Sequence, residues 1–201
     1  MIDPRTNRLC RLLGIDLPII QAGMVYMSGA RLAAAAAAAG CLGLLGAGSM
    51  RPDLLREQIR KTRALTDRPF GVNLPLLFSH SPACLEVALD EGVRIFVTSA
   101  GSPQRVAGRL KTAGAILLHV VASPGLARKC EDAGCDAVIC EGFEAGGHNG
   151  REELTTMVLV PQCAAAVSIP VVAAGGIATG AQWVAAMALG AEGVQIGSRF
   201  A

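Results

Sequence analysis

Two glycine motifs late in the sequence have the composition of an anion-binding site. Gly175-Gly176 ends an apolar run that starts at Val171, and Gly197-Ser198 ends another that starts at Gly193. Glycine lets backbone N–H groups approach an anion closely, and the N-terminus of a following helix adds positive potential. A tight turn alone would explain one such motif. Two motifs at the ends of successive strands predict a phosphate-binding site.

The segment EAGGHNG, residues 144–150, places one imidazole among glycines. Imidazole is the side chain that titrates near neutral pH, so a histidine on such a loop is suited to proton transfer. We therefore predict that His148 is an acid–base or substrate-orienting residue. His80 lies in the polar stretch SHSPAC and is predicted at the surface or in a substrate channel. His119 lies inside a strand and is predicted in the core or at its rim.

Two carboxylates in the same region suggest a second chemistry. Glu141 and Glu144 could form the acid–base pair of a glycoside hydrolase, but that reaction needs carboxylates on opposite sides of the substrate. Both lie at one strand end, without a partner from another strand. The glycosidase interpretation is therefore disfavoured, and Arg151-Glu152-Glu153 is predicted to be a solvated loop.

The elements that must position these residues alternate along the chain. Eight apolar runs predict strands, starting at Pro18, Leu42, Phe70, Ile95, Ala115, Ala137, Val171 and Gly193. Stretches rich in Ala or Leu predict helices over residues 33–39, 53–65, 104–113, 124–133, 155–167 and 179–189. Such alternation predicts βαβ units and a parallel sheet, and eight strands favour closure into a TIM (β/α)8 barrel. Active sites of this fold lie at the carboxyl ends of the strands.

The composition narrows the class of protein further. The chain has 201 residues, 52% of them hydrophobic, 17% charged and 3% aromatic, with a net charge of +2. These values predict one compact domain, with a small molecule as partner in place of nucleic acid or membrane. A homodimer is one option for its assembly. The start lacks a secretory signal pattern, so we expect a cytoplasmic protein. Its seven cysteines lack zinc-site spacing and are predicted to be small buried apolar residues.

The sequence stops at Ala201, directly after the eighth predicted strand. Because no eighth helix follows, we expect the barrel to expose apolar surface at this point. We also expect the sequence to be a fragment of a longer protein, with residues 1–201 forming a single truncated barrel.

The motifs together resemble those of a known family. They are IQAGM at residues 20–24, GVN at 71–73, EAGGH at 144–148, AAGGI at 173–177 and VQIGSRF at 194–200. In this order they resemble the nitronate monooxygenases, formerly called 2-nitropropane dioxygenases, and equally the related FMN-dependent enoyl-acyl-carrier-protein reductase II. The resemblance covers the chain from Pro18 to Phe200.

The resemblance implies a flavoprotein with FMN as cofactor and no metal. It places the phosphate at Gly175, Gly176, Gly197 and Ser198, and the isoalloxazine ring against Ala22, Gly23, Met24 and Asn73. It implies side contacts from Ser123, Glu141, Ala145 and Gly146, and it matches His148 to the family's catalytic histidine. Glu141 would accept hydrogen bonds from the ribityl chain or orient a loop. Family members carry a further helical segment over the flavin, and nothing in this sequence corresponds to that lid.

The resemblance leaves several activities open. A monooxygenase would oxidise alkyl nitronates with O2 to carbonyl compounds and nitrite, and His148 would bind the nitronate or deprotonate a nitroalkane. A reductase would pass hydride from NAD(P)H through FMN to an enoyl thioester. A barrel of the inosine-monophosphate dehydrogenase type needs a cysteine in the loop after the sixth strand, which this sequence lacks. A non-catalytic flavin-binding fragment is the remaining alternative. We rank nitronate oxidation first.

Overall fold

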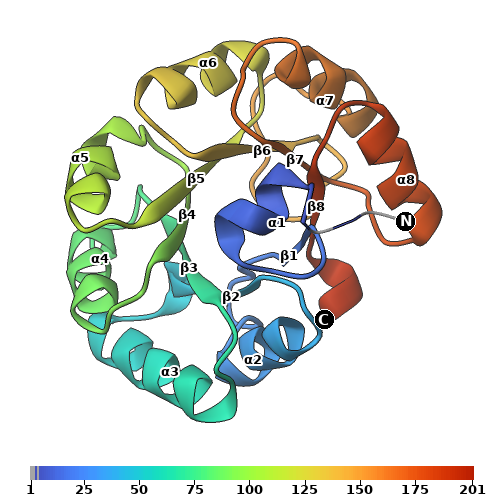
Figure 1. Cartoon of the computed structure of the whole chain (residues 1–201). Coiled ribbons are helices and arrows are strands. Elements are labelled where there is room, and N and C mark those ends of the chain that lie inside the picture. The colour runs from blue at the N-terminus through green and yellow to red at the C-terminus, as the bar shows by residue number, and fades with distance from the viewer. Residues whose placement is uncertain (1–2, 4) are drawn as a thin grey trace.

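The protein is a barrel of eight parallel strands surrounded by helices (Figure 1). The computed structural model describes residue 3 and residues 5–201. The strands are β1 (Ile19–Gln21), β2 (Gly43–Gly46), β3 (Phe70–Pro75), β4 (Ile95–Ser99), β5 (Ile116–Val121), β6 (Ala137–Glu141), β7 (Val171–Ala174) and β8 (Gly193–Ile196). Each starts within one residue of its predicted start. The prediction of a parallel α/β barrel is confirmed.

The barrel closes where β1 meets β2. Strands β1 and β8 pair over the whole length of β1, and the other strands follow in the order β8 to β2. A short parallel bridge between Ile20 and Leu42 completes the circle. The Gln21 N–H donates to the Leu42 carbonyl at 2.8 Å, and the Leu42 N–H donates to the Ile19 carbonyl at 2.9 Å.

Helices follow the strands and cover the barrel from outside. They are α2 (Ala30–Ala38), α3 (Pro52–Leu65), α4 (Ser81–Asp90), α5 (Gln104–Thr112), α6 (Pro124–Asp132), α7 (Thr156–Ala164) and α8 (Gly180–Ala188). All six predicted helices are present, with boundaries shifted by a few residues. Helix α4 was not predicted. It begins one residue after His80, so the predicted polar loop is in fact the start of a helix.

Two apolar layers stabilise this arrangement. Inside the barrel, buried residues such as Leu44, Leu118 and Ile139 fill the centre. Between barrel and helices, residues of opposite parity, such as Leu45 and Leu117, pack against the helices. All seven cysteines are buried and free of disulfides, and the described residues include no cluster of side chains that could hold a metal ion. The prediction that the cysteines are buried is confirmed.

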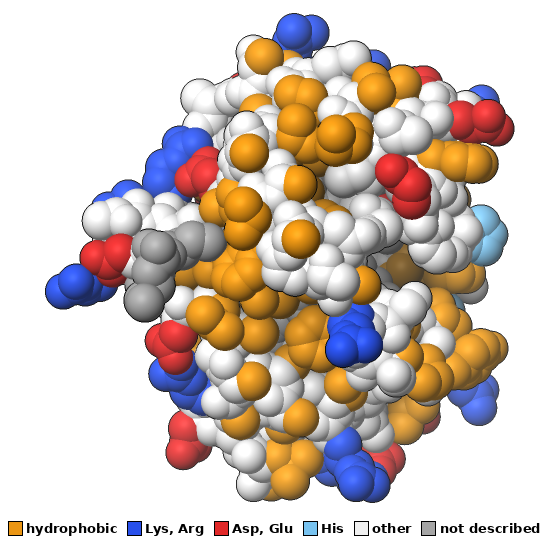
Figure 2. All heavy atoms as spheres, turned by 90° about the vertical axis from the view of Figure 1, so that its right-hand side faces the viewer, with side chains coloured by type: hydrophobic (Ala, Val, Ile, Leu, Met, Phe, Trp, Pro, Cys, Tyr) orange, Lys and Arg blue, Asp and Glu red, His pale blue; other side chains and the backbone are white. Residues whose placement is uncertain are grey.

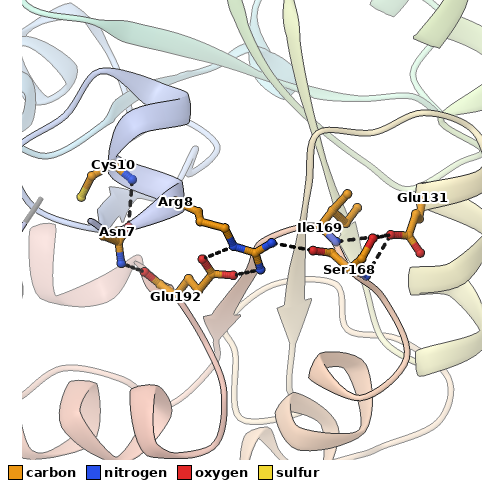
Figure 3. A network of polar contacts seen from close by, with 7 residues as sticks. All are labelled: Asn7, Arg8, Cys10, Glu131, Ser168, Ile169 and Glu192. Carbon is orange, nitrogen blue, oxygen red and sulfur yellow. Dashed lines mark hydrogen bonds and ion pairs between the residues drawn. The ribbon is translucent and has the colours of Figure 1, made fainter. Parts of the chain in front are cut away.

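A short helix, α1 (Arg8–Leu13), closes the amino-terminal end of the barrel. Leu9, Cys10 and Leu13 belong to the inner apolar layer. Polar contacts fasten α1 to distant loops (Figure 3). The Arg8 guanidinium donates to Glu192 Oε2 at 2.8 Å and to the Ser168 carbonyl at 2.7 Å. Ser168 N in turn donates to Glu131 at 2.9 Å. Helix α1 therefore covers the amino-terminal end of the barrel and is held there by these polar contacts.

The side of the barrel between α8 and α2 carries no full helix in the described residues. Only the 3-10 turn η2 (Ser198–Phe200) follows β8 there. Figure 2 turns this side toward the viewer and shows apolar side chains over the middle of the face. Val184 of α8 is 67% exposed. The exposed side chain of Val184 agrees with the predicted apolar surface on this side of the barrel. Within the described residues, the structure contains no helix with the length and hydrophobicity that a bilayer crossing demands.

Candidate active site

The two glycine motifs lie beside each other at the carboxyl end of the barrel, because β7 and β8 pair in register at Ala174 and Gln195. Gly175 and Gly176 have φ angles of +103° and +68°, which side chains rarely allow. A Cβ atom on Gly175 would lie 2.8 Å from the Gly142 carbonyl oxygen. In the described part of the chain, the N–H groups of Gly176, Gly197 and Ser198 have no protein acceptor. These are the features expected of a phosphate site.

Helix α8 points its N-terminus toward the same place. Thr179 caps the helix, and Gln182 Oε1 accepts hydrogen bonds from the N–H groups of Ala178 at 2.9 Å and Thr179 at 3.0 Å. This capping box fixes where α8 begins. The N–H groups of Gly180 and Ala181 are left without an acceptor among the described residues. Their partial positive charge faces the glycine motifs.

Buried Gln21 and Ser28 shape the loop after β1. Gln21 Oε1 accepts from the Leu44 N–H at 3.0 Å, and its Nε2 donates to Ser28 Oγ at 2.9 Å. Ser28 Oγ accepts from the Met24 N–H at 2.8 Å. These bonds fix the predicted flavin neighbours Ala22, Gly23 and Met24.

The β1 loop also contacts two other strand ends. A Cβ atom on Gly23 would overlap the Asn73 side chain, and one on Gly197 would lie 3.5 Å from Met24 Sδ. The structure therefore brings the predicted ring contacts and half of the predicted phosphate site together.

Three polar side chains enter the barrel mouth from β3, β6 and β8. Asn73 pairs in register with Val97, while Glu141 and Gln195 both pair with Ala174. Because Val97 and Ala174 belong to the inner layer, their partners point inward. Gln195 is 9% exposed, and its Oε1 has no hydrogen-bond partner among the described residues. Gln195 was not among the predicted site residues, although it is a polar residue in an otherwise apolar strand.

We expect Gln195→Leu to act in opposite directions with and without cofactor. In the flavin-free protein it removes an unpaired buried oxygen, so the melting temperature should stay unchanged or rise. If that oxygen or the amide N–H contacts bound FMN, the affinity for FMN should fall about tenfold. Thermal denaturation and flavin titration measure the two effects. A variant that lowers stability without changing FMN affinity would contradict the assignment.

Burial raises the pKa of the Glu141 carboxyl to about 7. The folded protein therefore keeps a proton that the unfolded chain releases near its ordinary value of 4.5. The contribution of Glu141 to the free energy of unfolding is greatest when the pH is below the ordinary pKa of 4.5. It falls as the pH rises and is lost once the pH passes about 7.

Glu141→Gln should remove this pH dependence. At about pH 8 the variant should be more stable by up to about 3 kcal/mol, at 1.36 kcal/mol per pKa unit. Urea denaturation of the flavin-free wild type and variant from about pH 4 to about pH 8 measures the difference. Parallel curves over this range would contradict the role of Glu141.

The loop between β6 and α7 carries the predicted catalytic histidine. His148 is exposed and takes part in no hydrogen bond among the described residues. Asn149 Nδ2 donates to the Phe143 carbonyl at 2.9 Å, and Glu144 accepts from the Thr156 N–H at 2.9 Å. Glu144 therefore holds the start of α7, which gives it a structural role apart from any carboxylate pair.

The remaining predicted residues lie around the same mouth. Ala145 and Gly146 belong to the His148 loop, whose residues 151–153 are exposed as predicted. Ser123 caps α6 at the end of β5, and its Oγ accepts from the Leu126 N–H at 3.4 Å. All of the predicted site residues thus lie at or after the carboxyl ends of strands, except Asn73, which lies two residues before the end of β3. Their contacts with a cofactor remain predictions.

The other two histidines lie apart from the mouth centre. His119 is 4% exposed, as predicted for a core residue, and its Nδ1 lies 2.7 Å from Thr98 Oγ1. Burial lowers its pKa to about 4, although the neighbouring Gly101 backbone acts in the opposite direction. His80 lies at the start of α4, and its ring stacks on Phe78 with centroids 5.6 Å apart.

Similar proteins share this fold over nearly the whole chain. A nitronate monooxygenase of Paraburkholderia phytofirmans is 39% identical, and the match covers 100% of this chain and 68% of that protein. A (3aS,4S,5R,7aS)-5-hydroxy-7a-methyl-1-oxo-octahydro-1H-indene-4-carboxyl-CoA dehydrogenase of Rhodococcus jostii is 40% identical over 96% of this chain. The chain spans 54% of that relative's length, so it corresponds to about half of it.

A solved structure matches closely as well. FabK from Thermotoga maritima superposes with a TM-score of 0.94 and 47% identity, covering 96% of this chain and 62% of that one. The family model described as nitronate monooxygenase matches residues 6–86 and 79–201. The chain belongs to the nitronate monooxygenase family of oxidoreductases.

Proposed function

We propose that residues 1–201 form one FMN-binding barrel of an oxidoreductase that oxidises alkyl nitronates with O2 to carbonyl compounds and nitrite. The observation that carries the proposal is the backbone surface formed by Gly175-Gly176, Gly197-Ser198 and the N-terminus of α8. Its glycine content and its N–H groups, which have no protein acceptor among the described residues, suit a phosphate monoester.

The barrel mouth also fits the rest of FMN. The unpartnered Oε1 of Gln195 and the side chain of Asn73 supply an acceptor and a donor inside the barrel. A planar ring with alternating carbonyl and N–H groups needs this combination. The chain would hold the phosphate at the glycine motifs and the ring between the β1 loop, Asn73 and Gln195. Glu141 would border the ribityl chain.

Bound FMN would supply the electron chemistry, accepting an electron from a nitronate or relaying a hydride from a nicotinamide. The protein would contribute position and polarity. His148, on its flexible loop, would pair with the anionic nitronate or remove a proton from a neutral nitroalkane. Met24 and Gly23 would keep water from one side of the ring.

Flavin reconstitution tests the proposal. The protein should bind FMN with the absorbance bands of oxidised flavin, and anaerobic addition of propyl nitronate should bleach them. Riboflavin, which lacks the phosphate, is the matched control and should bind far more weakly. A protein that remains colourless in excess FMN would overturn the cofactor assignment.

Enoyl thioester reduction is the second candidate function. It is supported by the 47% identity to FabK, which exceeds the 39% identity to the Paraburkholderia nitronate monooxygenase. Anaerobic NADH or NADPH should bleach the flavin if this candidate holds, whereas a nitronate should not. Flavin that neither donor bleaches would favour a non-catalytic flavin-binding role.

A further inference from the structure

The segments around the barrel mouth differ in charge. The segments that follow β1, β2 and β3 (residues 22–30, 46–50 and 73–85) contain no Asp, Glu, Lys or Arg. The segment that follows β6 (residues 141–153) contains four acidic residues and Arg151. The segments after β1, β2 and β3 therefore offer an uncharged environment to a ligand that enters the mouth, unlike the segment after β6.

Four apolar side chains are exposed on the uncharged segments after β1 and β3, and we call them the apolar ledge: Val25, Tyr26, Leu77 and Phe78. Their exposed fractions are 47%, 90%, 73% and 45%. The exposure is not scattered, because Val25 and Phe78 converge over Gly48. A Cβ atom on Gly48 would lie 3.5 Å from Val25 Cγ2 and 3.4 Å from Phe78 Cε2. Side chains from two loops thus lie within contact distance of the space above Gly48.

The backbone holds Tyr26 outward at a conformational cost. Its φ angle is +64°, a region that bulky side chains avoid. The loop is held there by a hydrogen bond from the Tyr26 N–H to Ser49 Oγ at 3.2 Å and by the Met24–Ser28 turn. Strain of this kind tends to occur at binding sites, where the surroundings enforce it. Asn or Gly would fit this backbone more easily.

The ledge is continuous with the proposed flavin site. Val25 and Tyr26 directly follow Met24, and Leu77 and Phe78 follow the strand that carries Asn73. The ring of Phe78 is further supported by the His80 ring, inclined by 12° to it. A ligand whose reacting group lies near Asn73 and His148 can therefore extend along this uncharged surface.

We propose that the apolar ledge binds the hydrocarbon tail of the substrate and sets the preference for tail length. The inference rests on the proposed function and adds that the preferred substrate carries an uncharged tail of several carbons beyond its reacting group. Burying each methylene on the ledge removes apolar area from water. Affinity should therefore rise with tail length by about fourfold per methylene, equivalent to about 0.8 kcal/mol.

The test uses two ligand series with a constant head and a growing tail. One series is alkyl nitronates from ethyl to hexyl, and the other is trans-2-enoyl thioesters of N-acetylcysteamine with four to ten acyl carbons. Equilibrium dialysis gives dissociation constants for the FMN-loaded and the FMN-free protein. FMN uptake is followed separately by absorbance, so failure of the cofactor assignment is distinguishable from failure of tail binding.

The variants are Tyr26→Asn, Phe78→Ser and their combination, with Val184→Asn on the exposed side of α8 as the control. Tyr26→Asn relieves the backbone strain, so this variant should fold at least as stably as the wild type. In the double variant the gain per methylene should fall below about twofold, whereas Val184→Asn should keep the wild-type gain. If affinity rises with tail length in only one of the two series, the reacting group of that series, nitronate or enoyl thioester, is the one that the substrate carries. Dissociation constants independent of tail length in both series, or a double variant with the wild-type gain, would overturn the proposal.

Discussion

Gly175→Ala should abolish detectable FMN binding and lower the free energy of unfolding by about 1–3 kcal/mol. The residue has a φ angle of +103°, and an added Cβ atom would lie 2.8 Å from the Gly142 oxygen and 2.9 Å from Thr156 Oγ1. To relieve these contacts, either the backbone at Gly175 or the loop between β6 and α7 must move. Either movement would disturb the phosphate site. Flavin absorbance after gel filtration measures binding, and urea denaturation measures stability.

Two further variants separate the phosphate site from general folding. Gly125→Ala on α6 is the matched control, because an added Cβ atom there meets nothing within 4 Å. It should change neither property. Gly176→Asn keeps a residue that tolerates a φ of +68° but adds a side chain beside the proposed phosphate site, where its Cβ atom would lie 3.2 Å from Glu144 Cβ. It should lose less stability than Gly175→Ala, because asparagine tolerates the positive φ and the approach to Glu144 is less close, and it should still lose FMN. If Gly176→Asn bound FMN as tightly as the wild type, the phosphate would have to bind elsewhere.

His148→Ala should leave FMN bound and the melting temperature unchanged, while turnover falls by about 10²–10⁴-fold. Stability should be preserved because the side chain is exposed and makes no hydrogen bond among the described residues. Steady-state oxygen consumption with propyl nitronate measures the effect. If enoyl reduction is the activity, NADPH oxidation with an enoyl thioester replaces it.

Arg151→Ala is the control for His148, because it lies on the same exposed loop. It should change turnover by less than about threefold, within the small effect expected of an exposed charge. The dependence of turnover on pH adds a second criterion. Loss of an acid–base group changes the shape of this pH profile, whereas a disturbed loop lowers turnover at every pH without changing the shape. Unchanged turnover in His148→Ala would remove the residue from the mechanism.

The strands were predictable because their apolar runs are bounded by glycine and polar residues. Their order followed from βαβ handedness, and closure followed from their number. Helix α1 was missed because it has only six residues, which are too few to show a helical repeat of apolar residues. Its apolar side chains are buried because they cover the end of the barrel. Helix α4 was missed because Ser81 and Pro82 resemble a loop, although proline is well suited to the first turn of a helix.

The site residues also differ in how readily they can be recognised in the sequence. Glycine motifs and His148 are recognisable because they interrupt apolar patterns at strand ends. Gln195 could not be placed, since whether it faces inward depends on its register with Ala174. The role of Glu144 depends on Thr156, twelve positions later in the sequence, whose N–H it accepts across the loop. Such contacts arise only when the chain is folded.

The contacts of helix α1 and strand β1 affect the order in which the chain folds during its synthesis on the ribosome. Asn7 Nδ2 donates to the Glu192 carbonyl across 185 residues of chain, and β1 gains its full-length partner only from β8. Until β8 emerges, β1 has only the short bridge beside Ile20, and its other edge is open to pairing with a neighbouring nascent chain. The earliest part of the polypeptide is thus the last to be secured, and a chaperone that shields the nascent amino-terminal segment would matter most before residue 192 is translated.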